Sequence, residues 1–224
     1  MKKSQGITIS RRNFIAGGIL GLVGGISMEG IVFPPSAMAE IPAIGSWPYT
    51  PLDPVEIGRS AWSPPGCEGC GGKSFGAIVY GLRSALGPGS VWENIPINLG
   101  MFGNGGGPFN QTCGAIIAPY LLMNLVGAGR ALGKPFYEWY CDFPFPSNEW
   151  DTYIPPSGPL PSKNLVQTVA GSTLCSVSRG IWQKEYFSVY GEGATEPRND
   201  RCIKLVCDCV KKAVEMLNDW KAGA

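Results

Sequence analysis

Eight cysteines carry most of the chemistry that this chain of 224 residues can perform. The chain contains no histidine. This excludes acid–base catalysis by histidine, Ser-His and Cys-His nucleophile pairs, and histidine-ligated zinc, copper or haem. A metal site must therefore use thiolates, carboxylates or backbone groups, while an even number of cysteines also permits disulfides. The eight are Cys67, Cys70, Cys113, Cys141, Cys175, Cys202, Cys207 and Cys209.

Cys67 and Cys70 form a C-x-x-C motif, a spacing that suits a dithiol redox pair or a pair of metal ligands. Gly71 stands where a covalent haem site would carry histidine, so the motif predicts no haem c. An iron-sulfur cluster, a framework of disulfides and zinc all remain open from the residues alone. Zinc would require an all-thiolate site.

The N-terminus carries the features of an export signal. Arg11 and Arg12 precede an apolar stretch, and Ala37-Met38-Ala39 offers small residues for cleavage. This order predicts a twin-arginine signal peptide over residues 1–39 and a periplasmic or otherwise extracytoplasmic protein, without membrane attachment after cleavage. The leader holds four of the 18 basic and one of the 17 acidic side chains, leaving 14 and 16, a formal charge of −2. This balance gives no reason to expect a nucleic-acid partner.

The rest of the chain must position the cysteines. Residues 40–66 are rich in proline, glycine and tryptophan and are expected to form an extended arm. Residues 67–224 predict a mainly α fold: a single-domain helical bundle with long Pro/Gly-rich irregular loops, the longest over 142–161. Helices are expected over 74–86, with Ser74 as N-cap and Gly87-Pro88 as the stop, over 113–125 with Pro119 inside, near 174–190, and over 201–220.

The last helix separates its three cysteines. At about 100° per residue, Cys202 and Cys209 lie on one edge of its apolar stripe, and Cys207 lies about 140° from Cys202 on the other edge. The three therefore cannot ligate one small centre together. The glycines over 103–107 precede Cys113, and we expect their backbone to pack tightly against the helix that Cys113 opens.

Four of the cysteines carry a family resemblance. Gly69-Cys70, Thr112-Cys113-Gly114-Ala115, Cys175 and Arg201-Cys202 follow one another as in the redox-active proteins named for their C…GCAxxG…C…C pattern. Over about residues 60–220 the chain resembles in particular the split-Soret cytochrome c branch of that group. It departs from the pattern at Ala118, which replaces the final glycine, and at Ser176, where that branch carries histidine after the cysteine.

The resemblance implies a helical homodimer with an iron-sulfur site in each subunit, but no haem, since the histidines are missing. It implies Cys70, Cys113, Cys175 and Cys202 as the ligands, with Cys67 and Cys209 as secondary candidates. We therefore predict an exported redox protein for electron transfer or redox sensing, with a redox partner protein, and not a substrate-converting enzyme. The alternatives are a cofactor-free, disulfide-stapled interaction subunit of an exported enzyme complex, and a thiol oxidoreductase that uses Cys67 and Cys70.

Overall fold

The computed structural model describes residues 41–106, 111–156 and 160–223, all within one compact unit of the chain, residues 39–224. The predicted signal residues Arg11, Arg12, Ala37 and Ala39 lie outside the described residues. Within the described ranges, no helix is long and apolar enough to cross a membrane.

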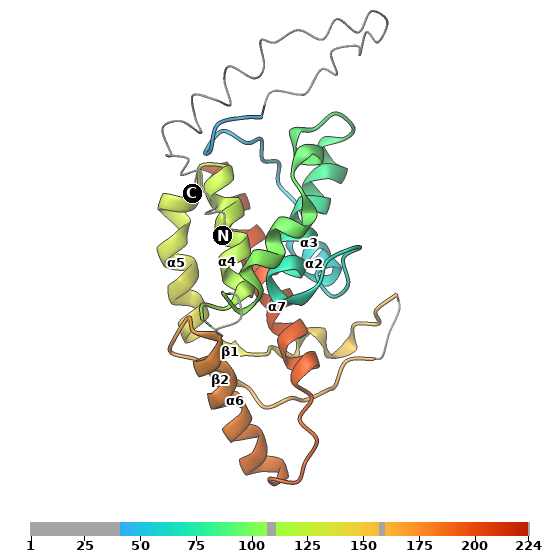
Figure 1. Cartoon of the computed structure of the whole chain (residues 1–224), viewed down its shortest axis with the longest axis vertical. Helices are drawn as coiled ribbons and strands as arrows, with labels where there is room; N and C mark the ends of the chain where they lie inside the picture. The colour runs from blue at the N-terminus through green and yellow to red at the C-terminus, as the bar shows by residue number, and fades with distance from the viewer. Residues whose placement is uncertain (1–40, 107–110, 157–159, 224) are drawn as a thin grey trace, which may run out of the picture. The chain divides into compact units, whose positions relative to one another are not determined.

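The described unit is mainly helical, which confirms the predicted fold class (Figure 1). Two short strands, β1 (Pro144–Phe145) and β2 (Thr168–Val169), pair antiparallel, with Pro144 opposite Val169. The helices are α2 (Pro54–Ser60), α3 (Gly69–Leu86), α4 (Gly114–Leu125), α5 (Gly129–Asp142), α6 (Cys175–Tyr190) and α7 (Arg198–Ala222), with 3-10 helices η1 (Val91–Asn94), η2 (Ile97–Gly106) and η3 (Asn148–Thr152).

Helix α7 is the central element of the unit, because it packs against α2, α3, α4 and α5. Its predicted apolar stripe is buried: Val206 is 1% exposed, and Val210, Val214 and Leu217 are fully covered. The predicted helix over 201–220 is therefore confirmed and extended at both ends. Cys70 lies in α3, Cys113 directly precedes α4, and Cys202 lies in α7. These three helices contact one another in pairs.

The arm over residues 40–66 is only partly extended. Trp47 is buried against Trp92, with ring centroids 4.8 Å apart, and its backbone N–H donates to the carbonyl of Leu125. The arm is not extended throughout, because α2 begins at Pro54. The side chain of Asp53 accepts hydrogen bonds from the first-turn N–H groups, and proline suits the first helical position, so these two residues start the helix.

Helix α3 begins at Gly69, five residues before the predicted start. Ser74 is therefore not its N-cap; its hydroxyl donates to the carbonyl of Cys70 at 2.6 Å, inside the helix. The cap comes from η2, where Asn104 Oδ1 accepts the N–H groups of Gly71 at 2.9 Å and Gly72 at 3.2 Å. The predicted stop is confirmed, since the helix ends at Leu86 and the next residue is a glycine with φ of +77°.

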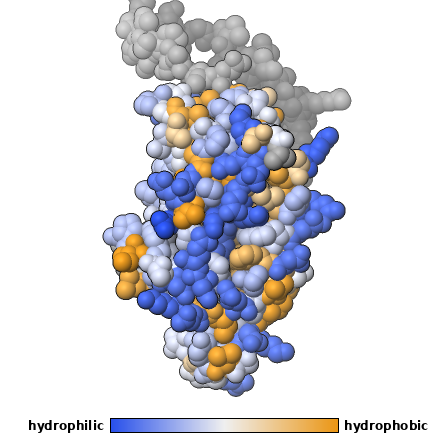
Figure 2. All heavy atoms as spheres, turned by 180° about the vertical axis from the view of Figure 1, so that it is seen from behind, coloured by the Kyte–Doolittle hydropathy of each residue, from blue (hydrophilic) through white to orange (hydrophobic). Residues whose placement is uncertain are grey.

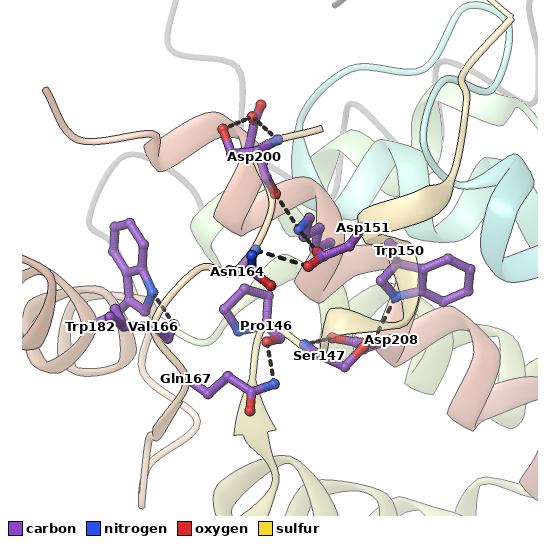
Figure 3. Close-up of polar contacts among 12 residues, drawn as sticks. Pro146, Ser147, Trp150, Asp151, Asn164, Val166, Gln167, Trp182, Asp200 and Asp208 are labelled. Carbon is purple, nitrogen blue, oxygen red and sulfur yellow. Dashed lines mark hydrogen bonds and ion pairs between the residues drawn. The ribbon is translucent and has the colours of Figure 1, made fainter. Parts of the chain in front are cut away.

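The long segment between α5 and α6 is held against α7 by buried polar contacts (Figure 3). Lys204 is fully buried and donates to the carboxylate of Asp151 and to the carbonyl of Ser162. Asp208 accepts hydrogen bonds from the indole of Trp150 at 2.7 Å and from the backbone of Ser147 at 2.9 Å. The predicted loop over 142–161 is thus ordered where it is described, and it contains β1 and η3.

Exposed hydrophobic side chains are spread over several elements, including η2, β2 and α6. Figure 2 shows that, on the face it draws, hydrophilic residues form a broad band with smaller hydrophobic groups beside it. A dispersed pattern of this kind is usual where a protein faces water.

Candidate cofactor site lined by four cysteines

The four cysteines implied by the family pattern lie near the starts of four helices. Cys70 is the second residue of α3, and Cys113 directly precedes the first residue of α4. Cys175 is the first residue of α6, and Cys202 is the fifth residue of α7. The first backbone N–H groups of a helix lack partners within the helix and carry partial positive charge. The starts of α3, α4 and α6 therefore favour an anionic group bound beside Cys70, Cys113 and Cys175.

Backbone pairing aligns the starts of α4 and α6. Thr112 and Leu174 form an isolated antiparallel bridge. On either side of it, the N–H of Cys113 donates to the carbonyl of Thr173 at 2.8 Å, and the N–H of Cys175 donates to the carbonyl of Gln111 at 2.6 Å. The two cysteines, more than 60 residues apart in sequence, are thereby fixed beside each other.

Glycines bring α3, η2 and α4 into close contact. A Cβ on Gly114 would lie 2.0 Å from the carbonyl oxygen of Gly103 and 2.6 Å from the sulfur of Cys70. A Cβ on Gly71 would lie 2.4 Å from the carbonyl oxygen of Gly100. The predicted packing of the glycine run against the Cys113 helix is confirmed at Gly103. The absence of a side chain at Gly114 lets the Cys70 sulfur approach the start of α4.

The four cysteines line a single pocket of about 270 Å³. The side chains of Cys70 and Cys113 are hydrogen-bonded to each other. Cys70 and Cys202 lie close enough to Cys175 that a thiolate at either position would raise the pKa of Cys175. Cys70 and Cys202 also line an adjoining pocket, where the neighbouring side chains include Lys73 and Val206. The structure thus brings the four predicted residues together; that they hold a cofactor stays a prediction.

The other cysteines face elsewhere. Cys67 lies against Gly76 of α3, where a Cβ would be 2.2 Å from its sulfur, and its thiol donates to the carbonyl of Pro65 at 3.4 Å. Cys209 is fully buried near Cys113, where a thiolate at Cys209 would raise the pKa of Cys113. It does not line the pocket. Cys141 lines a separate pocket beside α5, and Cys207 is buried on the side of α7 that faces α2.

Basic and hydrogen-bond donor groups surround the cysteines. Arg179, Arg198 and Arg201 line the pocket, and no aspartate or glutamate does so. Arg201 is only 3% exposed. Its guanidinium donates to the hydroxyl of Ser178 at 2.6 Å and lies 3.9 Å from the sulfur of Cys202. Two buried guanidinium nitrogens of the pocket lining, Nε of Arg179 and Nε of Arg201, have no hydrogen-bond partner among the described residues, while the hydroxyl of Tyr140 contacts Cys113 and Ser178.

Two thiols of the pocket, Cys113 and Cys175, have raised pKa values. The hydrogen bond to Cys70, together with burial, raises the pKa of Cys113 well above its usual range. Burial raises the pKa of Cys175, and the negative charges of Cys202 and Cys70 add to this, while Arg201 and Arg179 oppose it. Binding of a metal would therefore release protons from these thiols.

The described residues contain no group of three or more histidine, cysteine, aspartate or glutamate side chains placed to hold a metal ion as they stand. The pocket leaves room for a larger group, and its unpaired donors suit one that is anionic, as a cluster of iron and sulfide held by thiolates is.

The described thiols give no support to a disulfide framework. Cys67, Cys113, Cys141, Cys175, Cys202, Cys207 and Cys209 are free. Cys70 contacts Cys113 through a hydrogen bond. The expected separation of Cys207 from the other cysteines agrees with its burial beside Gly58 of α2, whose Cβ would lie 3.3 Å from the Cys207 carbonyl oxygen.

Sequence analysis missed the polar residues of the site. Asn104 comes from η2, which shows no helical periodicity in sequence, and Tyr140 comes from α5, which was not predicted. The burial of Arg201 was not foreseen either. Its position directly before Cys202 was the one available signal, since a charged residue beside a candidate ligand can face the same site.

The chain has a fold similar to that of a split-Soret cytochrome c. The particular protein that it is similar to is the split-Soret cytochrome c from Desulfovibrio desulfuricans ATCC 27774, whose structure was described for a novel iron centre. The match has a TM-score of 0.63 at 24% identity and covers 79% of this chain and 72% of that chain. At this identity the likeness establishes the fold. No protein-family model and no curated protein matched the chain, so membership of the wider C…GCAxxG…C…C group stays a prediction.

Proposed function

We propose that this chain is an exported redox protein that binds an iron-sulfur cluster through Cys70, Cys113, Cys175 and Cys202. The observation that carries the proposal is the convergence of these four side chains on one pocket, whose described lining includes two unpaired arginine nitrogens and no carboxylate. The iron centre named for the split-Soret cytochrome of the same fold adds support. When bound, such a cluster takes up and gives back single electrons.

The residues of the chain would hold and tune this group. The four thiolates would ligate iron, while the helix starts and the arginines offset the negative charge. Tyr140 and Leu205 line the pocket, and burial raises the pKa of Tyr140 far above its usual range, so its hydroxyl stays protonated and can donate. Haem c is not part of the proposal, because the chain has neither histidine nor a C-x-x-C-H motif.

Electron transfer or redox sensing fits this site better than conversion of a substrate. Leu174, which directly precedes α6, and Val177 and Ile181 within α6 are exposed by 42%, 37% and 40%. They lie next to Cys175, so they offer an apolar contact for a redox partner protein or for a second copy in a homodimer. We place this activity in the periplasm, after cleavage of residues 1–39.

The test is a set of single Cys→Ser variants, purified without oxygen and compared by visible absorption. Replacement of Cys70, Cys113, Cys175 or Cys202 should remove most of the absorption of the wild type. Cys141→Ser is the matched control, since Cys141 is also partly buried but lines a different pocket, and Cys207→Ser should likewise keep the absorption. Equal absorption in all six variants would contradict the proposed ligands.

The same variants test the thiol oxidoreductase alternative. A nucleophilic cysteine needs a lowered pKa, whereas burial raises the pKa of Cys67, and its sulfur lies against Gly76. We expect Cys67→Ser to keep the absorption and to leave any thiol-disulfide exchange activity unchanged. Loss of such an activity in both Cys67→Ser and Cys70→Ser, with a colourless wild type, would favour the oxidoreductase.

A further inference from the structure

Arg201 is a buried cation without an anionic partner. It is 3% exposed, and none of the ion pairs found in the described residues includes it. Its contacts are the hydroxyl and carbonyl of Ser178, the sulfur of Cys202 at 3.9 Å, and the ring of Trp182 at 5.9 Å from the guanidinium carbon. Its Nε has no acceptor at all. A buried charge left unpaired in this way is strongly destabilising.

Nearby carboxylates are engaged elsewhere. Asp200, the residue before Arg201, accepts hydrogen bonds from the backbone and the hydroxyl of Ser162 at 2.8 and 2.5 Å. Asp208, two turns further along α7, accepts from Ser147 and Trp150 (Figure 3). The carboxylates of α7 closest in sequence therefore hold the long segment in place and leave Arg201 uncompensated.

The guanidinium faces the cysteine pocket, which it lines together with Arg179. It lies 3.9 Å from the sulfur of Cys202. Two arginines with unpaired Nε atoms, one of them almost wholly buried, are explained if the group in the pocket is negatively charged. Arginine suits this role because it remains protonated and presents several donors in a fixed plane.

We propose that Arg201 is the buried counter-ion of an anionic group held by the four cysteines, and that its charge raises the reduction potential of that group. This inference rests on the proposed iron-sulfur function. A tetrathiolate cluster is anionic and becomes more negative by one charge on reduction, so a fixed cation stabilises the reduced form more than the oxidised form. The cation thus links two properties, the retention of the cluster and its potential.

The experiment compares Arg201→Met with the wild type, each purified without oxygen and each also stripped of iron by chelation. Methionine removes the charge and keeps much of the apolar length. The iron-free variant should unfold at the same temperature as the iron-free wild type or higher, because an unpaired buried charge has gone. The iron-loaded variant should unfold at a lower temperature than the loaded wild type and lose iron faster.

The redox titration supplies a second readout. The equilibrium constant for one-electron reduction should fall about tenfold in Arg201→Met, which corresponds to a potential about 59 mV more negative. Arg201→Lys keeps the charge and should restore most of the potential. The matched control is Arg83→Met, which removes a guanidinium that donates to the carbonyls of Trp92 and Ile95 away from the pocket, and it should leave the potential unchanged.

Three outcomes would overturn the inference, and they differ from one another. An iron-loaded Arg201→Met protein with the wild-type potential would show that the charge does not act on the bound group. Equal destabilisation of the loaded and iron-free forms would assign Arg201 a purely structural role. A wild-type protein without iron would instead refute the proposed function itself, and the inference with it.

Discussion

Gly114 decides how closely the Cys70 sulfur can approach the start of α4. A methyl group at this position would lie 2.0 Å from the backbone oxygen of Gly103, which cannot turn away as a flexible side chain can, and 2.6 Å from the sulfur of Cys70. Overpacking of this kind costs about 1–3 kcal/mol. The substitution would therefore weaken the contact between α3, η2 and α4, where Cys70 and Cys113 lie close together.

Gly114→Ala should therefore lower the free energy of unfolding by about 2 kcal/mol and reduce the iron content of the purified protein. Urea unfolding and an iron assay would measure both. Gly180→Ala is the control, since Gly180 lies in the interior of α6 with open space around its Cβ. That variant should gain about 0.5–1 kcal/mol from helix propensity and keep its iron. A Gly114→Ala protein as stable as the wild type would contradict the close packing.

The four cysteines of the pocket were predictable from sequence because their order and flanking glycines form a recognisable pattern. Arg201 and Tyr140 were not predictable in the same way. Burial of a charged or aromatic side chain depends on which helices surround it, and these helices come from segments far apart in the chain. The site was thus predictable in its ligands and not in its counter-charges.

At the scale of elements, the helices over 113–125, 174–190 and 201–220 were predictable to within a few residues, the first from its nearly continuous apolar run and the last from its helical periodicity. Three features escaped prediction. The first turn of α3 reads Gly-Cys-Gly-Gly, a poor helix sequence that is capped from a distance by Asn104. Helix α2 is only seven residues long. Helix α5 contains both Gly133 and Pro135, which obscure its pattern.

Asn104→Ala tests the distant cap. Loss of an acceptor shared by two first-turn N–H groups should lower the free energy of unfolding by about 1 kcal/mol and, because Cys70 lies in that turn, weaken iron retention. Asp53→Ala removes a comparable cap from α2, which does not line the pocket, and should cost a similar amount without loss of iron. Identical iron contents in the two variants would show that the cap does not position Cys70.

At the scale of the whole molecule, buried polar groups on α7 attach the long segment between α5 and α6 (Figure 3). Burial raises the pKa of Asp208 from 3.8 to about 6, although hydrogen bonds from Ser147 and Trp150 oppose the shift. Between these two values the folded protein holds a proton that the unfolded chain has released. The stabilisation from this proton is complete below the unfolded pKa and is lost as pH rises through about 6.

Stability should therefore fall as the pH is raised. Asp208 alone should remove roughly 2 kcal/mol of unfolding free energy between pH 4 and pH 7. Asp208→Asn cannot titrate and should lose correspondingly less over the same range, as denaturant unfolding at several pH values would measure. Asp53→Asn, which changes an exposed carboxylate, is the control and should follow the wild type. Parallel pH profiles for Asp208→Asn and the wild type would contradict the account.

The central claim concerns what the four cysteines hold, and one measurement tests it most directly. The mature protein is purified without oxygen, and its iron and acid-labile sulfide are determined per chain, with visible absorption recorded on the same sample. The account predicts iron and sulfide in equal amounts, at two or more atoms of each per chain, in a coloured protein. A colourless protein with neither iron nor sulfide, in which every cysteine is accounted for as a free thiol or in a disulfide, would contradict it.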